Sequence, residues 1–347
     1  RAHRCGAIYL LHWDIEIDGT CGALRCTWSL SDVVCRNVLA AMTIEQPADE
    51  ASHAEMERQI CERVSAALGM GYGAVRLFET KALSFEIEPG YSAVVRAHEF
   101  PVCQSPVLYA RLREALERTV RMDPKYTDAW SWLAYIYVSA VRNGFAPAAE
   151  RETLLQQALE AVHCALELEP LSAQAHQMRS TVLFQLGQFK EFELAGRLAI
   201  KLNPGNPDRL MFLGSRLFCM GRFDEGAELL WQAFSMYTYM PRIVFIPLIW
   251  DFCRRGQYRE ADDFASPIPV SSDFYLYHVA MVALCDKLGR PDRVEKHIAA
   301  LLALRPDYAS EFADDFAVRM IHHDVTSAMA SGLRRGGLTV PHGIFDV

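Results

Sequence analysis

The chain has 347 residues, 51% of them hydrophobic and 22% charged, which is the composition of a folded protein rather than a disordered one. Its formal net charge of −8 disfavours nucleic-acid binding by this chain itself, because phosphate contacts need a basic surface. No apolar run in the sequence approaches the roughly 20 residues of a membrane-spanning helix, and we expect no membrane association.

Residues 1–72 are predicted to form a small α+β domain. Alternating apolar and polar residues indicate strands over residues 7–17 and 23–31, joined by a hairpin turn at Asp18-Gly19, and a third strand over residues 37–44. In the second strand, Leu24, Cys26, Trp28 and Leu30 share one face, and Arg25, Thr27 and Ser29 share the other.

A helix is predicted after the strands, and it ends at about Leu68, before the glycines at 69, 71 and 73. A three-stranded sheet with one helix is marginal by itself. The chain also starts at Arg1 without an initiator methionine or a signal peptide. We therefore expect a fragment of a longer polypeptide, whose missing N-terminal part completes this domain.

Ten cysteines are scattered through the chain without a C-x-x-C pair, and four of them fall in helical patterns, where cysteine behaves as a small apolar residue. We therefore predict reduced thiols in a cytoplasmic protein. Cys21 and Cys26 follow His12, but their spacing fits no standard zinc site, so neither a metal nor another cofactor is predicted.

Residues 73–90 contain glycine and proline and are interpreted as a linker. Helical periodicity begins at Tyr91, and a helix from Val107 to Met122 ends at Asp123-Pro124. Residues 91–124 are predicted to form a degenerate entry repeat, because the first unit of a repeat array is often atypical.

A helix-pair pattern then recurs at a nearly constant interval. Pro170 and Pro204 each end a helical segment and are 34 positions apart, and the glycines 187, 221, 256 and 289 follow at intervals of 34, 35 and 33. Trp130, Leu133, Ala134 and Tyr137 fit the key positions of a first helix. With this period, a glycine in mid-unit and a proline at the end, the chain resembles the tetratricopeptide repeat family.

The resemblance implies a mostly α chain, with a tetratricopeptide α-solenoid behind the small α+β domain. The repeats are predicted over residues 128–170, 171–204, 207–240, 242–270 and 275–306. Residues 307–347 are predicted to form capping helices and a tail, with one buried helical stripe that contains Met320, Ile321, Val325, Met329 and Leu333.

The front of the chain has a resemblance of its own. Tyr9-Leu10-Leu11, a hairpin, a third strand and the helix over residues 57–68 resemble the second half of the TolB-like domain, which precedes tetratricopeptide arrays in bacterial regulators. Two groups share this arrangement: HilA-type winged-helix transcriptional regulators and certain class III adenylate cyclases. Cys21, Cys26 and Cys35 depart from the family pattern.

In a tetratricopeptide superhelix the first helix of each pair faces the concave surface, where a partner binds. The resemblance places there Tyr135, Gln177, Thr181, Phe184, Met211, Ser215, Phe218, Ile246, Trp250 and Arg254. The lysine and asparagine set with which co-chaperone repeats bind a C-terminal carboxylate is absent, so that partner is not predicted. An amphipathic helix or loop suits this mixed surface better. The alternative for each position is core packing, above all for Trp250, whose helix is apolar nearly all round.

Enzymatic chemistry is not predicted for this fragment. The sequence contains no P-loop, zinc-protease motif, nucleophile elbow or dinucleotide-binding motif. His322-His323-Asp324 is a formal metal-binding candidate, but adjacent histidines on a helix point about 100° apart, which disfavours a shared metal.

These features predict the sensory and protein-interaction module of a bacterial transcriptional regulator. It is expected to bind a protein or peptide in the repeat groove and to reach DNA only through a missing N-terminal domain. The alternatives are the regulatory C-terminal region of a class III adenylate cyclase and a stand-alone scaffold protein. A homodimer is a further expectation, because the open edge of an incomplete sheet can pair with a second copy.

Overall fold

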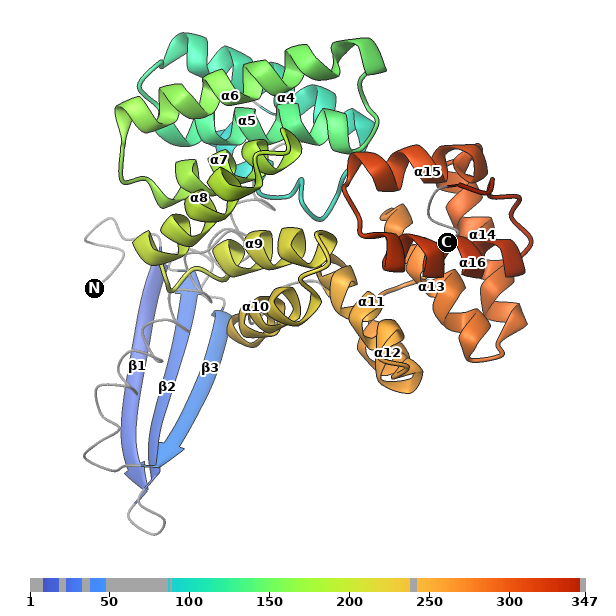
Figure 1. Cartoon of the computed structure of the whole chain (residues 1–347). Coiled ribbons are helices and arrows are strands. Elements are labelled where there is room, and N and C mark those ends of the chain that lie inside the picture. Colours follow the sequence, from blue (N-terminus) through green and yellow to red (C-terminus); the bar gives the residue numbers. More distant parts are fainter. Residues whose placement is uncertain are drawn as a thin grey trace. The chain divides into compact units, whose positions relative to one another are not determined.

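The computed structural model describes residues 9–18, 23–32, 38–47, 87, 89–237 and 242–343. They fall into two compact units, one with the strands and one with the helices, and each is described by itself (Figure 1). The helix predicted before residue 69, together with Cys21 and Cys35, lies outside the described residues.

The first unit contains an antiparallel sheet of three strands in the order β1-β2-β3. The strands are β1 (Tyr9–Asp18), β2 (Ala23–Asp32) and β3 (Val38–Pro47). Cys26, Trp28 and Leu30 of β2 are buried, whereas Arg25, which points to the other face of the strand, is exposed. The three strands are therefore confirmed, and the residues predicted on one face of β2 are buried at positions 26, 28 and 30.

The helical unit begins with α3 (Tyr91–Ala97) and α4 (Pro106–Met122). Ser105 caps α4, because its hydroxyl accepts a hydrogen bond of 3.1 Å from the amide of Leu108. The helix ends at Met122, as the sequence predicts, and buries Leu112, Leu116 and Val120.

Helix pairs joined by short turns make up the middle of this unit. The first two pairs are α5 (Thr127–Arg142) with α6 (Arg151–Leu168), and α7 (Ala173–Gln185) with α8 (Phe189–Leu202). The next three are α9 (Pro207–Cys219) with α10 (Phe223–Met236), α11 (Ile246–Arg254) with α12 (Tyr258–Ala265), and α13 (Tyr275–Lys287) with α14 (Pro291–Leu304). Two 3-10 helices, η2 (Ala148–Glu150) and η3 (Arg242–Phe245), precede α6 and α11.

The periodic glycines end the first helix of a pair. Gly187, Gly221, Gly256 and Gly289 have φ values of 74°, 85°, 73° and 64°, in the left-handed region that a residue with a β-carbon rarely adopts. Gly214 and Gly226 have a different role, because a β-carbon on Gly214 would lie 2.9 Å from the carbonyl oxygen of Gly226. Helices α9 and α10 therefore touch backbone to backbone.

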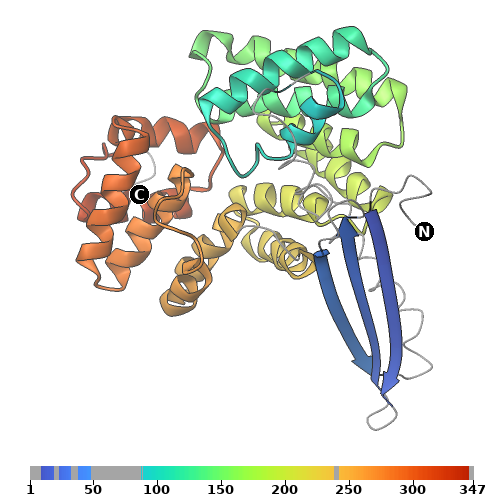
Figure 2. The same ribbon diagram turned by 180° about the vertical axis from the view of Figure 1, so that it is seen from behind.

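The chain ends in α15 (Tyr308–Val318) and α16 (His323–Arg335). Helix α16 lies against α13 in both views, and a β-carbon on Gly332 would lie 2.6 Å from the Cα atom of Ala283 (Figures 1 and 2). Val325, Met329 and Leu333 are buried, as predicted. Met320 and Ile321 were wrongly placed on the same helical stripe, because they lie in the turn between the two helices, where Met320 has a φ of 55°.

This turn contacts repeats far from it in the sequence. Gln185 donates a hydrogen bond of 2.7 Å to the carbonyl oxygen of Val318, and Arg319 donates one of 2.7 Å to the side chain of Asn143. The ring of His322 lies 5.2 Å from the ring of Phe223, measured between centroids. The C-terminal segment therefore covers the last repeat with α16 and also contacts the first three repeats.

Two further features bear on the class of protein. None of the helices in the described ranges has both the length and the apolar character needed to span a bilayer. The six described cysteines, at positions 26, 103, 164, 219, 253 and 285, are all free thiols.

Candidate functional site

The inner helices of the repeats surround a cavity of about 100 Å³, large enough for several water molecules or a side chain. Its lining comes from the first helices α5, α7, α9, α11 and α13, the segment before α4, η3, and the turn after α15. The lining residues are Pro101, Gln104, Tyr135, Arg142, Phe184, Met211, Phe212, Ser215, Arg216, Cys219, Ile243, Val244, Ile246, Pro247, Trp250, Phe274, Leu276, Arg319 and Ile321.

Six of the residues that the sequence assigned to the groove line this cavity: Tyr135, Phe184, Met211, Ser215, Ile246 and Trp250. Tyr135 packs edge-on against Trp132 and Phe212, with 5.6 Å and 5.6 Å between ring centroids. These rings hold the wall in place. Whether the six residues contact a partner is a proposal, taken up below.

Arg254 lies apart from this cavity. It lines a second cavity of about 370 Å³, which shares Trp250 with the first and is bordered by α16 residues such as Met329. Its guanidinium is 2.9 Å from the carboxylate of Asp251 and lies 4.7 Å above the ring of Phe223. Arg254 is therefore engaged within the chain already.

Gln177, Thr181 and Phe218, which the sequence also assigned to the groove, do not line either of these two cavities. Gln177 accepts a hydrogen bond from Arg209, and the hydroxyl of Thr181 donates to the carbonyl oxygen of Gln177 at 3.1 Å. Phe218 is 0% exposed and packs where α9 crosses α10 at Gly226. All three side chains are buried, as are Tyr135, Phe184 and Trp250, and their contact with a partner stays a prediction.

The cavity is also lined by three arginines that were not predicted from the sequence: Arg142, Arg216 and Arg319. Arg319 is neutralised, since its guanidinium donates to Asp315 at 3.0 Å and to the hydroxyl of Tyr275 at 2.6 Å. Burial alone would lower the pKa of Arg319, but Tyr275 and Asp315 raise it above its ordinary value.

Arg142 and Arg216 have no such partners. Within the described ranges, neither guanidinium has an ion pair, and Nη2 of Arg216, a residue 8% exposed, has no hydrogen-bond partner. Burial, and then the charges of Arg216 and Arg319, lower the pKa of Arg142 to about 9. Burial also lowers the pKa of Arg216. Both shifts reflect the cost of burying a cation without an opposite charge beside it.

A second unpaired donor belongs to the same cavity. Trp250 is 4% exposed, and its indole Nε1 is buried without a hydrogen-bond partner. A buried indole N–H normally has a partner, since leaving it unpaired costs about 1–3 kcal/mol. The sequence assigned Trp250 to the concave side of the repeats and kept core packing as the alternative. Its burial agrees with both interpretations.

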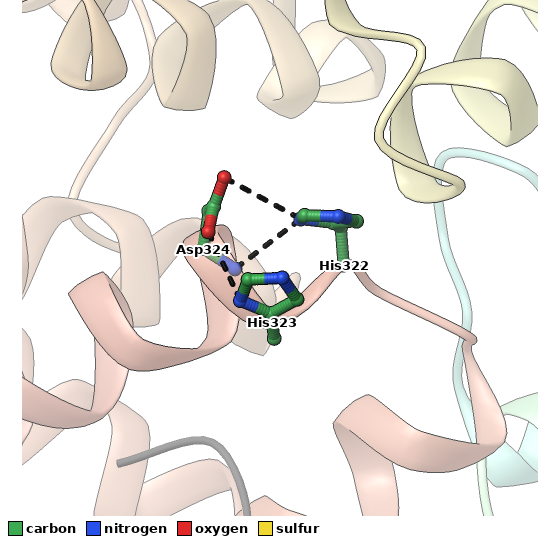
Figure 3. Close-up of side chains that lie close together, drawn as sticks. All are labelled: His322, His323 and Asp324. Carbon is green, nitrogen blue, oxygen red and sulfur yellow. Dashed lines mark hydrogen bonds and ion pairs between the residues drawn. The ribbon is translucent and has the colours of Figure 1, made fainter. Parts of the chain in front are cut away.

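His322, His323 and Asp324 come together more closely than the sequence analysis expected (Figure 3). The two imidazole centroids are 4.2 Å apart, and the possible ligand atoms of the three residues lie within 4.8 Å of one another. The expectation that the rings diverge was wrong, because His322 is the N-cap of α16 and not part of the helix. Its Nδ1 accepts a hydrogen bond of 3.3 Å from the amide of Asp324, so the capping interaction already uses this nitrogen.

Comparison with known proteins supports the fold. A family model described as "Tetratricopeptide repeat" matches residues 139–207, which include α6, α7 and α8. Among solved structures, the Cut9-Hcn1 hetero-tetramer of the APC/C is similar, with a TM-score of 0.50, 13% identity, and coverage of 85% of this chain and 58% of that one. The chain thus has the fold of a tetratricopeptide α-solenoid, preceded by a small sheet-containing unit.

Two bacterial structures are also similar. The tetratricopeptide protein TTC0263 of Thermus thermophilus matches with a TM-score of 0.38 and 23% identity, over 52% of this chain and 91% of that one. PilF of Pseudomonas aeruginosa matches with a TM-score of 0.43 and 14% identity, over 67% and 94%. No curated protein sequence matches this chain.

Proposed function

We propose that this chain is the sensory, partner-binding module of a bacterial transcriptional regulator, and that it binds a segment of another protein in the cavity between its first helices. The observation that best supports this function is the pair of unpaired donors, Arg216 Nη2 and Trp250 Nε1, on the side of the solenoid that receives ligands. An array of helix pairs offers a binding surface but no reactive group, so no catalytic role is assigned to the chain.

The regulator part of the proposal rests on the TolB-like order of elements in the first unit, to which the meander β1-β2-β3 lends support. DNA contact is assigned to a separate domain, since the net charge of this chain is −8. A cytoplasmic location is proposed as well, and the six free thiols agree with a reducing compartment.

A variant that fills the cavity tests partner binding. Ser215 lines the cavity, so Ser215→Tyr places a ring where a ligand would bind, whereas Leu194→Tyr makes the same kind of change at a site that is 71% exposed. The full chain is immobilised, incubated with lysate of its source organism and washed, and retained proteins are quantified. A true partner is retained by the wild type and by Leu194→Tyr but not by Ser215→Tyr. Equal retention by all three forms would rule out this cavity as the binding site.

Two alternatives share the same module, a class III adenylate cyclase and a scaffold protein. The domain encoded next to this one in the gene separates them: a basic recognition helix belongs to the regulator, and paired metal-binding aspartates belong to the cyclase. A gel shift that showed nanomolar DNA binding by residues 1–347 at physiological salt would contradict the assignment of DNA contact to another domain. Light scattering tests the proposed homodimer.

A further inference from the structure

The cavity has an uneven charge balance. Three guanidinium groups line it, and the carboxylate of Asp315 is bonded to only one of them, Arg319. Asp315 is itself shared, since the hydroxyls of Tyr275 and Tyr308 donate to it at 2.7 Å and 3.0 Å. Among the described residues, its ion pairs are with Arg305 and Arg319 and not with Arg142 or Arg216, so the surplus of positive charge belongs to these two residues.

Buried charges of like sign repel each other and cost free energy unless an opposite charge is present. Arg142 is in the last turn of α5, where the helix dipole favours a cation, but this does not account for the unpaired Nη2 of Arg216 on α9. An anion in the cavity would pair with both guanidinium groups and supply the acceptor that Arg216 lacks.

The residues that line the cavity indicate which kind of anion would bind there. Most of the lining is apolar, with the rings of Tyr135, Phe184, Phe212 and Trp250. A phosphate or sulfate needs donor contacts on all sides, and among these rings only Tyr135 and Trp250 carry a donor group. A carboxylate is planar, takes two hydrogen bonds on one edge, and is attached to a hydrocarbon body that aromatic walls accommodate.

We propose that Arg142, Arg216 and Trp250 form a binding site for one carboxylate. The aromatic walls of the cavity contact the hydrocarbon part of the residue that carries the carboxylate, or the apolar side chain of the residue next to it. The guanidinium groups provide charge-assisted hydrogen bonds, and the indole N–H of Trp250 provides a neutral one. The identification of the ligand as a peptide rests on the proposed function. This site differs from the lysine and asparagine set with which co-chaperone repeats bind a C-terminal carboxylate, because its donors are arginine and tryptophan.

The carboxylate is assigned to an acidic side chain within the bound segment rather than to a chain terminus. Trp250 also lines the second cavity, of about 370 Å³, which offers space next to the first cavity for the rest of a bound segment.

The test uses the full chain with ¹⁵N-labelled tryptophan and two capped dipeptides, acetyl-Phe-Glu-amide and its uncharged twin acetyl-Phe-Gln-amide. The indole N–H signal of Trp250, assigned with Trp250→Phe, is followed during titration. We expect the glutamate peptide to shift this signal saturably in the millimolar range and the glutamine peptide to bind at least tenfold more weakly. Arg142→Gln and Arg216→Gln should each weaken binding of the glutamate peptide about tenfold, and Arg111→Gln, an exposed arginine on α4, should not.

Four results would overturn the proposal: no saturable shift with the glutamate peptide, equal binding of its glutamine twin, tighter binding of inorganic phosphate, or tighter binding of acetyl-Gln-Phe with a free C-terminus. Indole spectra of each variant without ligand show whether it is folded. Separate results would contradict the proposed function and the carboxylate site. If Ser215→Tyr loses a partner while both arginine variants retain it, the cavity binds a partner but not through a carboxylate. If no partner is found, the titration still decides the carboxylate site.

Discussion

Gln185 in α7 donates a hydrogen bond of 2.7 Å from its side-chain nitrogen to the backbone carbonyl oxygen of Val318, 133 positions later in the sequence. Arg319, the next residue, makes the same kind of link with Asn143 at the end of α5. These bonds attach the turn after α15 to the first two repeats, beside the cavity that Arg319 and Ile321 help to line. The C-terminal segment thus forms part of the wall of the proposed binding site.

Arg319→Met is expected to lower the free energy of unfolding by about 3 kcal/mol, because it leaves the buried carboxylate of Asp315 without its guanidinium partner. Urea denaturation followed by circular dichroism measures this loss. Arg179→Met removes an exposed arginine from α7 and should change the stability by less than about 0.5 kcal/mol. Equal effects of the two substitutions would show that the link to Asn143 and Asp315 does not stabilise the helical unit.

Arg216→Met is expected to have the opposite effect and to raise the free energy of unfolding by about 1 kcal/mol. The substitution removes a buried charge that repels Arg142 and leaves an apolar side chain of similar length against the ring of Phe212. Thermal and urea unfolding of the unliganded chain measure the gain. A clear loss of stability would mean that Arg216 is structural, and it would remove the main support for an anion site.

The buried pair His278 and His297 should make the protein sensitive to acid. Nε2 of His278 lies 2.9 Å from the carbonyl oxygen of Ser272 and must donate to it, and its Nδ1 lies 3.0 Å from Nδ1 of His297. When both rings are neutral, Nδ1 of His278 accepts from Nδ1 of His297. Burial lowers both pKa values, and burial with the neighbouring His278 lowers the pKa of His297 to about 4.

The sign of the pH effect follows from these shifts. In the unfolded chain the histidines take up protons below about pH 6.5, whereas in the folded chain His297 stays neutral down to about pH 4. The contribution of His297 to the free energy of unfolding is fully present above pH 6.5. It falls by on the order of 3 kcal/mol as the pH drops toward 4. Unfolding at pH 7.5 and 4.5 measures this difference. His297→Leu should reduce it, and the exposed His163→Leu should leave it unchanged.

Two glycines in second helices form a matched pair. A β-carbon on Gly226 would lie 2.7 Å from the backbone nitrogen of Phe218, which cannot move without separating α9 from α10. On Gly196 it would meet the tip of Leu213 at 2.9 Å, a side chain with other rotamers. Gly226→Ala should therefore cost about 2 kcal/mol, and Gly196→Ala should be nearly neutral, because alanine also favours the helix. Similar melting temperatures for both variants would contradict the backbone contact.

The regular features of the fold follow from local sequence. The alternation in β2, the end of α4 before Asp123-Pro124 and the four turn glycines each depend on residues close together in the chain, and patterns of period 2 and 34 identify them. Gly221 is typical, since its place in the period identified it and its φ of 85° lies in the left-handed region.

The site could be predicted only in part. Concave positions such as Tyr135, Ser215 and Trp250 follow from the repeat register, but Phe218, at a similar position, is buried where the backbones of α9 and α10 meet. The arginines have no local signal. Arg142 and Arg319 each end a helix and resemble solvated residues with a favourable dipole interaction, and only the folding back of the C-terminal segment brings them to one cavity.

This folding back also changes how the helical unit comes apart. An array of repeats that contact only their neighbours frays from its ends, one unit at a time. Here the residues around Val318 to His322 are bonded or packed against Asn143, Gln185 and Phe223, so the last helices also depend on the first ones. We therefore expect these repeats and the last helices to come apart together, rather than one unit at a time from the C-terminal end.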